Sequence, residues 1–116
     1  MKYPVRNLLA TISFLLLLIL ATISNVVLSG PVLYVHDNAG KLATLDATTG
    51  NVDIIGNMGV TMTDIAFSPT GDLYGISFGR LYSIDIDTAQ ATLIGNHAVP
   101  GGNTLAFGED GTLYAA

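Results

Sequence analysis

A stretch of about 40 residues occurs twice in this chain, and this repetition limits the folds open to it more than any other feature. Residues 42–57 match residues 81–96 at an offset of 39, and residues 65–74 match residues 105–114 at an offset of 40. Each period holds several short strand-like runs that end in Gly, Asn or Asp. This combination indicates repeated sheets that stack on one another.

Each period divides into four short strands. The sequence predicts strands at 63–68, 73–78, 81–86 and 91–94, with counterparts at 103–107, 32–36, 42–46 and 52–55, and the beginning of a ninth at Leu113. Apolar residues occupy both alternation phases of many strands, as expected where sheets pack face to face. The predicted fold class is all-β: β-propeller blades, four-stranded antiparallel repeats of 39–40 residues in an incomplete ring, preceded by an N-terminal hydrophobic signal helix.

The number of strands is too small for a closed propeller. A closed ring has about 4–8 blades of four strands, whereas residues 30–116 provide a little over two blades. Either the sequence is a fragment of a longer reading frame, or several copies assemble to bury the exposed faces. The run 113–116 favours the fragment, because it would otherwise be an abandoned strand with an unpaired edge.

The first 29 residues have the pattern of a targeting signal. Lys2 and Arg6 precede an apolar run, and small or polar residues follow it, so that cleavage after Ser29 or Ser24 is predicted. An uncleaved signal anchor is the alternative, since residues 8–28 are long enough to form a transmembrane helix of roughly 20 residues. Both interpretations export the remainder to an extracellular, periplasmic or cell-surface location. The domains expected are 1–29, a signal peptide or signal anchor, and 30–116, a partial β-propeller.

The exported part is acidic and lacks cysteine. Lys41 and Arg80 are its only basic residues against nine carboxylates, which gives it a formal charge of −7. Nucleic acid and anionic membrane surfaces are therefore excluded as partners, because both require a basic patch. The absence of cysteine excludes disulfides and thiolate metal sites.

Several acidic residues lie in the predicted turns. Asp46 and Asp85 occupy the same repeat position, so that we expect them to cap backbone N–H groups rather than to bind a ligand. The same structural interpretation applies to Asp72, Asp87 and Asp110. The alternation Asp85-Ile86-Asp87 lacks the Gly, the further oxygen ligands and the closing Glu of a calcium loop.

Two segments carry a resemblance to known repeats. The run 63–74 resembles the inner-strand hairpin of YVTN-type and NHL-type β-propeller repeats, and residues 81–95 resemble the third and fourth strands of the same WD40-like blades. The likeness covers 33–115 and is greatest to exported bacterial propeller proteins of the PEP-type sorting group. This chain departs from them because it contains no sorting motif and no later blades. The resemblance implies a fold and export, and leaves the function open.

Positions at which the repeats differ are the candidate binding residues, because shared positions are explained by packing. The polar differences are His36 against Ile76, Asp37 against Ser77, Asp64 against Thr104 and His97 against Met58. In a blade these positions fall near one rim. The ligand-rim candidates are therefore His36, Asp37, Asp64, His97 and Asn103.

Two function classes are compatible with these residues. The first is a non-catalytic binding or scaffold module for a protein, glycan or matrix partner, supported by the lack of a convincing nucleophile, phosphate loop or metal cluster. The alternative is a fragment of a calcium-dependent lactonase or gluconolactonase-like hydrolase, which the resemblance of residues 100–107 to the metal-lining hairpin of that group implies. Asn103 and Asp64 would then be weak Ca²⁺ candidates, but calcium takes about six or more oxygen ligands. The first class is favoured, with self-association as a further option if no blades follow.

Overall fold

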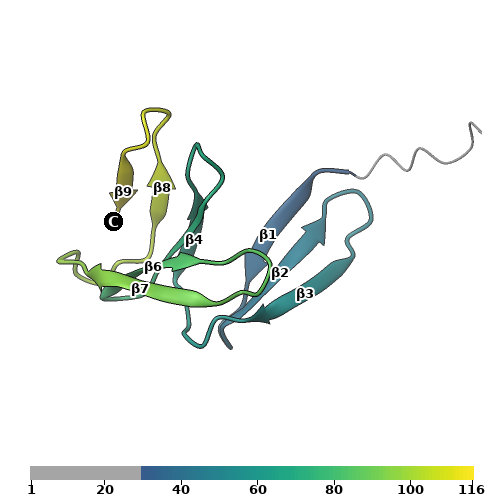
Figure 1. Ribbon diagram of the computed structural model, residues 1–116, viewed down its shortest axis with the longest axis horizontal. Coiled ribbons are helices and arrows are strands. Elements are labelled where there is room, and N and C mark those ends of the chain that lie inside the picture. Colours follow the sequence, from purple (N-terminus) through teal and green to yellow (C-terminus); the bar gives the residue numbers. More distant parts are fainter. Residues whose placement is uncertain (1–29) are drawn as a thin grey trace, which may run out of the picture.

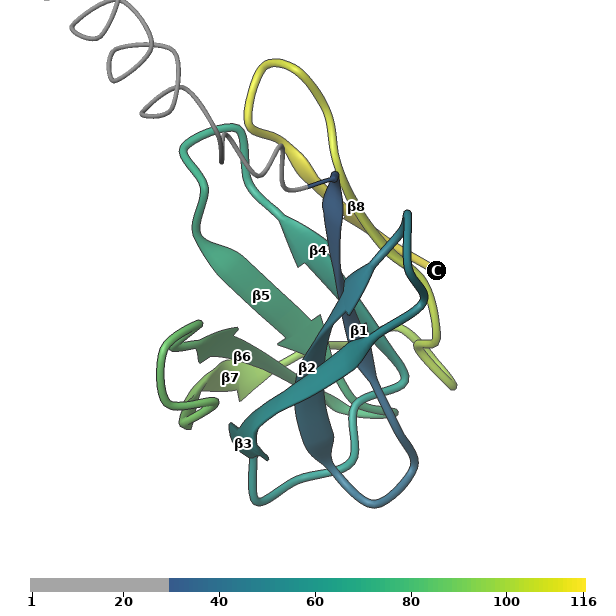
Figure 2. The same cartoon turned by 90° about the vertical axis from the view of Figure 1, so that its right-hand side faces the viewer.

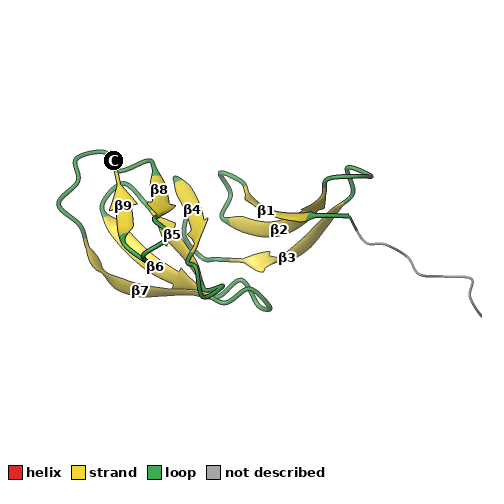
Figure 3. Cartoon of the chain, turned by 90° about the horizontal axis from the view of Figure 1, so that it is seen from above, coloured by secondary structure: helices red, strands yellow, loops and turns green. Residues whose placement is uncertain are grey.

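The computed structural model describes residues 30–116, so that the predicted signal peptide or anchor lies outside the described residues. This part of the chain consists of nine β-strands joined by turns and loops, without a helix (Figure 3). No helix capable of crossing a bilayer is therefore found within residues 30–116. The prediction of an all-β fold with antiparallel strands is confirmed.

The strands are short, as the spacing of the turns requires. Their bounds are β1 Val32–His36, β2 Lys41–Asp46, β3 Val52–Asn57, β4 Asp64–Phe67, β5 Leu73–Ile76, β6 Arg80–Ile84, β7 Ala91–Asn96, β8 Leu105–Phe107 and β9 Leu113–Ala115. Neighbours in sequence pair with each other, which gives sheets of order β1-β2-β3, β4-β5-β6-β7 and β8-β9 (Figure 1). We call them the first, second and third sheet.

Several predicted strand bounds are wrong by two residues: the strand predicted to begin at Asn103 begins at Leu105, and two others end early for local reasons. The strand predicted to end at Phe78 ends at Ile76, because Ser77 N–H donates to the Arg80 carbonyl and closes a turn. The strand predicted to end at Ile86 ends at Ile84, where the carboxylate of Asp85 begins the next turn. In contrast, β3 and β7 extend beyond their predicted ends through register shifts in their pairing with β2 and β6.

The repeat fixes which strands are equivalent. β1, β5 and β9 each carry a Leu-Tyr pair, and β4 and β8 each carry an Ala-Phe pair, at the same positions of their hairpins. The second sheet therefore contains all four strands of the repeat. By the same equivalence, the first sheet has the last three strands of a repeat, and the third sheet has the first two.

The hydrophobic core lies between the first and second sheets (Figure 2). Leu42 of the first sheet packs with Leu73 and Ile84 of the second, and the two methionines of the β3–β4 loop, Met58 and Met62, close the cluster. Burial of such side chains contributes roughly 1.5–3 kcal/mol each relative to leaving them exposed. This packing sets the second sheet against one face of the first.

Aromatic pairs join consecutive sheets at equivalent positions. The rings of Tyr34 and Phe67 meet edge to face at 5.0 Å between centroids, and those of Tyr74 and Phe107 lie 5.3 Å apart. Each pair connects the second strand of one repeat to the inner strand of the next. The contact between the second and third sheets thus reproduces the contact between the first and second.

One buried turn residue has a left-handed backbone without being glycine. Ala89 has φ 65°, whereas its repeat equivalent Gly50 has φ 76° and open space around it. The left-handed conformation costs an alanine roughly 1–2 kcal/mol. The Ala89 methyl group lies fully buried in the core beside Gly56, so that packing offsets this cost.

Candidate functional site

The five candidate residues lie at the loops of one end of the sheets. His36 and Asp37 lie where β1 meets its turn to β2, and Asp64 begins β4. His97 and Asn103 lie in the loop between β7 and β8. The register of β5 against β4 and β6 puts the β5–β6 turn at this same end. We call this end the loop rim.

His97 holds two of these loops together. Its Nε2 lies 2.9 Å from the Ser77 carbonyl oxygen, and its Nδ1 accepts a hydrogen bond from the Val99 N–H at 3.3 Å. Since Nδ1 accepts, Nε2 carries the proton and donates to Ser77. Gly102 closes over the ring, because a Cβ at this position would lie 2.8 Å from the His97 Cε1. His97 therefore positions the loop between β7 and β8.

Asp37 closes the hairpin between β1 and β2. One carboxylate oxygen accepts hydrogen bonds from the N–H groups of Ala39 and Lys41, at 2.9 and 2.8 Å. The hydrogen bond from Lys41 lowers the pKa of the Asp37 carboxyl below its ordinary value of 3.8. This side chain is exposed but fixed in direction by its own turn.

Asp64 links the second sheet to the third. Its Oδ1 accepts from the Ile65 N–H at 2.9 Å, and its Oδ2 accepts from the Leu105 N–H of β8 at 2.7 Å. The neighbouring Thr63 hydroxyl lies 2.9 Å from the Ile76 carbonyl and 2.8 Å from the Gly102 carbonyl. These contacts set the position at which β8 begins beside β4.

His36 and Asn103 have fewer contacts. The Nδ1 of His36 is buried and has no hydrogen-bond partner among the described residues. Asn103 is exposed, and its Oδ1 lies 3.3 Å from the Thr104 hydroxyl. The structure thus joins His97 to the β5–β6 turn and Asp64 to the residues after Asn103, while His36 lies beside Asp37 on the first sheet.

The residues present do not fit a calcium site. Both oxygens of Asp64 accept backbone N–H groups, and Asn103 adds one amide oxygen. Within the described range 30–116, no group of three or more His, Asp or Glu side chains has an arrangement that holds a metal ion. Calcium takes about six or more oxygen ligands, more than these two residues offer.

The sequence interpretation missed Phe78. This residue lies in the β5–β6 turn directly after Ser77, and its side chain is 70% exposed. Its signal was a large apolar residue between Ser and Gly, and the prediction of a strand over 73–78 concealed its place in a turn. The ring lies on a loop that the hydrogen bond between His97 and Ser77 holds.

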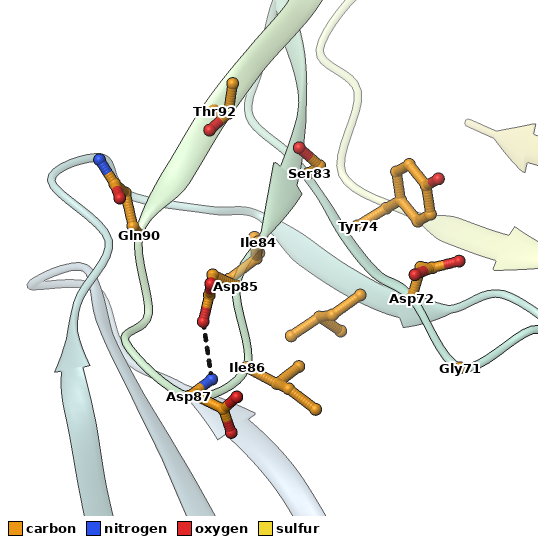
Figure 4. A pocket seen from close by; sticks show the side chains of 11 residues that line it. Gly71, Asp72, Tyr74, Ser83, Ile84, Asp85, Ile86, Asp87, Gln90 and Thr92 are labelled. Carbon is orange, nitrogen blue, oxygen red and sulfur yellow. Dashed lines mark hydrogen bonds between the residues drawn. The ribbon is translucent and has the colours of Figure 1, made fainter.

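An acidic cleft lies at the opposite end of the second sheet. It has a volume of about 440 Å³ and is bordered by the carboxylates of Asp72, Asp85 and Asp87 (Figure 4). Its floor is formed by Tyr74, Ser83 and Thr92, which lie across from one another in register. Asp85 accepts N–H bonds from residues 87 and 88, so that it serves its own turn, as the sequence predicts.

Hydrogen bonds to turn carboxylates predict that the protein loses stability in acid. Backbone N–H donors lower the pKa of Asp46, Asp85 and Asp110 below 3.8 in the folded state. A depressed carboxyl pKa stabilises the fold above the unfolded value, and this contribution is lost as the pH falls through the folded value. We expect the melting temperature to fall between about pH 4 and pH 2.

Thermal melting followed by circular dichroism over this range checks the acid prediction. The variant Asp85→Asn keeps the acceptor oxygen but removes the titration, so that its melting temperature should fall less steeply below about pH 4. Asp87→Asn is the matched control, since the Asp87 carboxylate accepts no backbone N–H within residues 30–116. Identical slopes for Asp85→Asn and the parent would contradict the assignment.

Comparisons with known proteins leave the family open. No protein-family model matches the chain, and no curated protein matches its sequence. Its function is accordingly argued from the loop rim, the charge and the exposed faces of the sheets.

Proposed function

We propose that this chain is an exported, non-catalytic binding module built from β-propeller blades. Its loop rim would contact a protein, glycan or matrix partner that carries positive charge. Support comes from the 39–40 residue repeat, from the four-stranded second sheet and from the equivalent aromatic contacts between successive sheets. The loops would bind the partner, and the sheets would hold the loops in place.

The observation that carries the proposal is the exposed ring of Phe78 on a fixed loop. Ser77 accepts a hydrogen bond from His97, and its own N–H donates to Arg80, so that both sides of the turn are held. A binding surface that is ordered before it meets its partner loses less conformational entropy on association. Phe78 would then provide apolar contact area at little entropic cost.

Charge determines which partners this surface favours. Residues 30–116 have a formal charge of −7, but the loop rim holds Asp37 together with Lys41 and Arg80, the two basic residues of this part of the chain, whereas Asp72, Asp85 and Asp87 lie at the opposite end of the second sheet. A field of this sign attracts basic partners and repels acidic ones, and salt weakens the effect because the Debye length is about 8 Å at physiological ionic strength. The net charge of residues 30–116, rather than the charges of the rim itself, therefore favours a lysine-rich partner, which would also offer an aromatic or apolar group to Phe78.

Peptide titration followed by NMR tests the proposal. A lysine-rich peptide should shift the amide signals of residues 77–79 and 37–41 at low salt, and a glutamate-rich peptide of equal length should not. We expect Phe78→Ala to weaken binding by about tenfold, which corresponds to 1.4 kcal/mol. Tyr114→Ala removes another exposed aromatic ring, on β9, and should leave binding unchanged.

Two results would count against the binding module. The first is equal binding of the two peptides, which would remove the charge argument. The second is a set of signal shifts confined to the acidic cleft, residues 83–92, with Phe78→Ala binding as tightly as the parent. Either result would leave the fold untouched and would relocate or remove the proposed surface.

A further inference from the structure

The first sheet leaves one apolar face uncovered. Tyr34 packs toward the second sheet, so that its neighbour Leu33 points to the opposite, open face. Leu33 is 50% exposed, whereas Leu73, its equivalent in the second sheet, is 2% exposed because it packs against the first sheet. The strand positions of the second sheet that pack toward the first have apolar equivalents here at Leu33, Val35, Leu45 and Val52, and the nearby Ile54 is 63% exposed.

The second sheet has the matching open face. Ile94 is 53% exposed, whereas its equivalent Ile55 packs against the core of the first and second sheets. A Cβ added to Gly95 would have no atom within 4 Å. A Cβ added to its equivalent Gly56 would lie 2.7 Å from the Thr88 carbonyl oxygen. The floor residues of the acidic cleft, Tyr74, Ser83 and Thr92, lie in register on this face, since Thr92 lies two residues before Ile94 in β7.

A third gap lies beside β1. This strand pairs with β2 on one edge only, whereas its equivalent β5 pairs with both β4 and β6. A cleft of about 250 Å³ borders the free edge, lined by residues 32–34 of β1 and residues 65–67 of β4. The inner strands β4 and β8 already contact each other. A further inner strand placed in this cleft beside β4 would extend the same row of contacts.

From these gaps we infer that the chain associates head to tail with a second copy of itself. The open face of the first sheet of one copy packs on the open face of the second sheet of another, as the second sheet packs on the first within one chain. β8 of one copy pairs with β1 of the other and takes the place of the missing inner strand. One interface thereby fills all three gaps.

The pairing register of this association follows from the repeat. Within the second sheet, Phe67 lies opposite Leu73 and Asp64 opposite Ile76. The equivalent pairs set Phe107 of one copy opposite Leu33 of the other, and Thr104 opposite His36. Directly opposite side chains in antiparallel strands have Cβ atoms about 4.5–5.5 Å apart.

The incoming β1 replaces β9. The two strands occupy equivalent positions, and β9 is held to β8 through three residue pairs and the backbone hydrogen bonds between Ala116 and Thr104. After the exchange, β8 of one copy and β1, β2 and β3 of the other form one four-stranded sheet. Each copy then contributes two complete sheets. A head-to-tail interface closes into a ring when the rotation permits.

Light scattering after size exclusion tests the association on the exported chain over a range of protein concentrations. We expect a defined species larger than the monomer, whose share rises with protein concentration. Leu33→Lys and Ile94→Lys introduce a charge into the two different faces at half-exposed positions, and each should raise the apparent dissociation constant at least about tenfold. Leu93→Lys is the matched control, because Leu93 is 51% exposed and lies on the other face of the same strand.

Mixing the two variants distinguishes head-to-tail contact from other modes. Each variant keeps the face that the other has lost, so that an equimolar mixture should form a one-to-one complex although each alone is monomeric. A parent that stays monomeric at every concentration would overturn the proposal, and so would variants that associate like the parent. These outcomes are independent of peptide binding at the loop rim, which the monomer can show.

Discussion

Replacing Leu73 by alanine is expected to lower the free energy of unfolding by about 2–5 kcal/mol, the range for large-to-small substitutions in a core. Leu73 is among the largest fully buried side chains of the described residues, and it packs with Leu42 and Ile84 between the first and second sheets. Its removal leaves a cavity at the contact that holds the two sheets together. Chemical denaturation of the dilute protein gives the size of the loss.

Leu33→Ala is the control for this substitution. Leu33 occupies the same repeat position and forms the same kind of strand pair, but half of its surface is exposed in the isolated chain. The expected loss is below about 1 kcal/mol, since the side chain is less buried and leaves no enclosed cavity. Equal losses for Leu73→Ala and Leu33→Ala would contradict the position of the core.

The second large effect is expected at Gly56 of β3. An added Cβ would lie 2.7 Å from the backbone carbonyl oxygen of Thr88 and 3.2 Å from the Ala89 methyl group. Because the closest atom belongs to the backbone, the β6–β7 turn would have to move away from the first sheet. Overpacking of this kind costs about 1–3 kcal/mol. The change is measurable as a lower denaturation midpoint of Gly56→Ala.

Gly95→Ala provides the matched control for Gly56→Ala. It lies at the equivalent position of β7, where a Cβ would meet no atom within 4 Å. In dilute solution we expect its free energy of unfolding to lie within about 0.5 kcal/mol of the parent. A comparable loss at both glycines would mean that strand propensity, and not the contact with Thr88, determines the effect.

The strand content of the fold was predictable because it depends on local properties. Turn residues and the repeat divide residues 30–116 into nine strands, and the structure has nine. Errors arose at strand ends such as Ser77, where a turn hydrogen bond ends the pairing earlier than the apolar pattern indicates. Hydrogen bonds of this kind join residues a few positions apart and leave little trace in hydropathy.

The shared end of the candidate residues was predictable, but their hydrogen bonds were not. Comparing repeats selected His97 and Asp64 as unusual polar residues at one end. Their hydrogen bonds to Ser77 and Leu105 join loops 20 and 41 residues apart, so that only the folded chain reveals them as structural. Phe78 escaped notice because its exposure depends on where β5 ends.

The sequence by itself determined the period, the strands, the capping role of Asp46 and Asp85 and the acidic character of residues 30–116, since each depends on neighbours in the chain or on composition. Tertiary structure alone decided that Leu73 is buried while Leu33, at the same repeat position, is half exposed. The reason is physical: a strand's pattern specifies which faces are apolar, but burial requires a second sheet to cover them. Here one copy of the repeat is covered within the chain and the other is not.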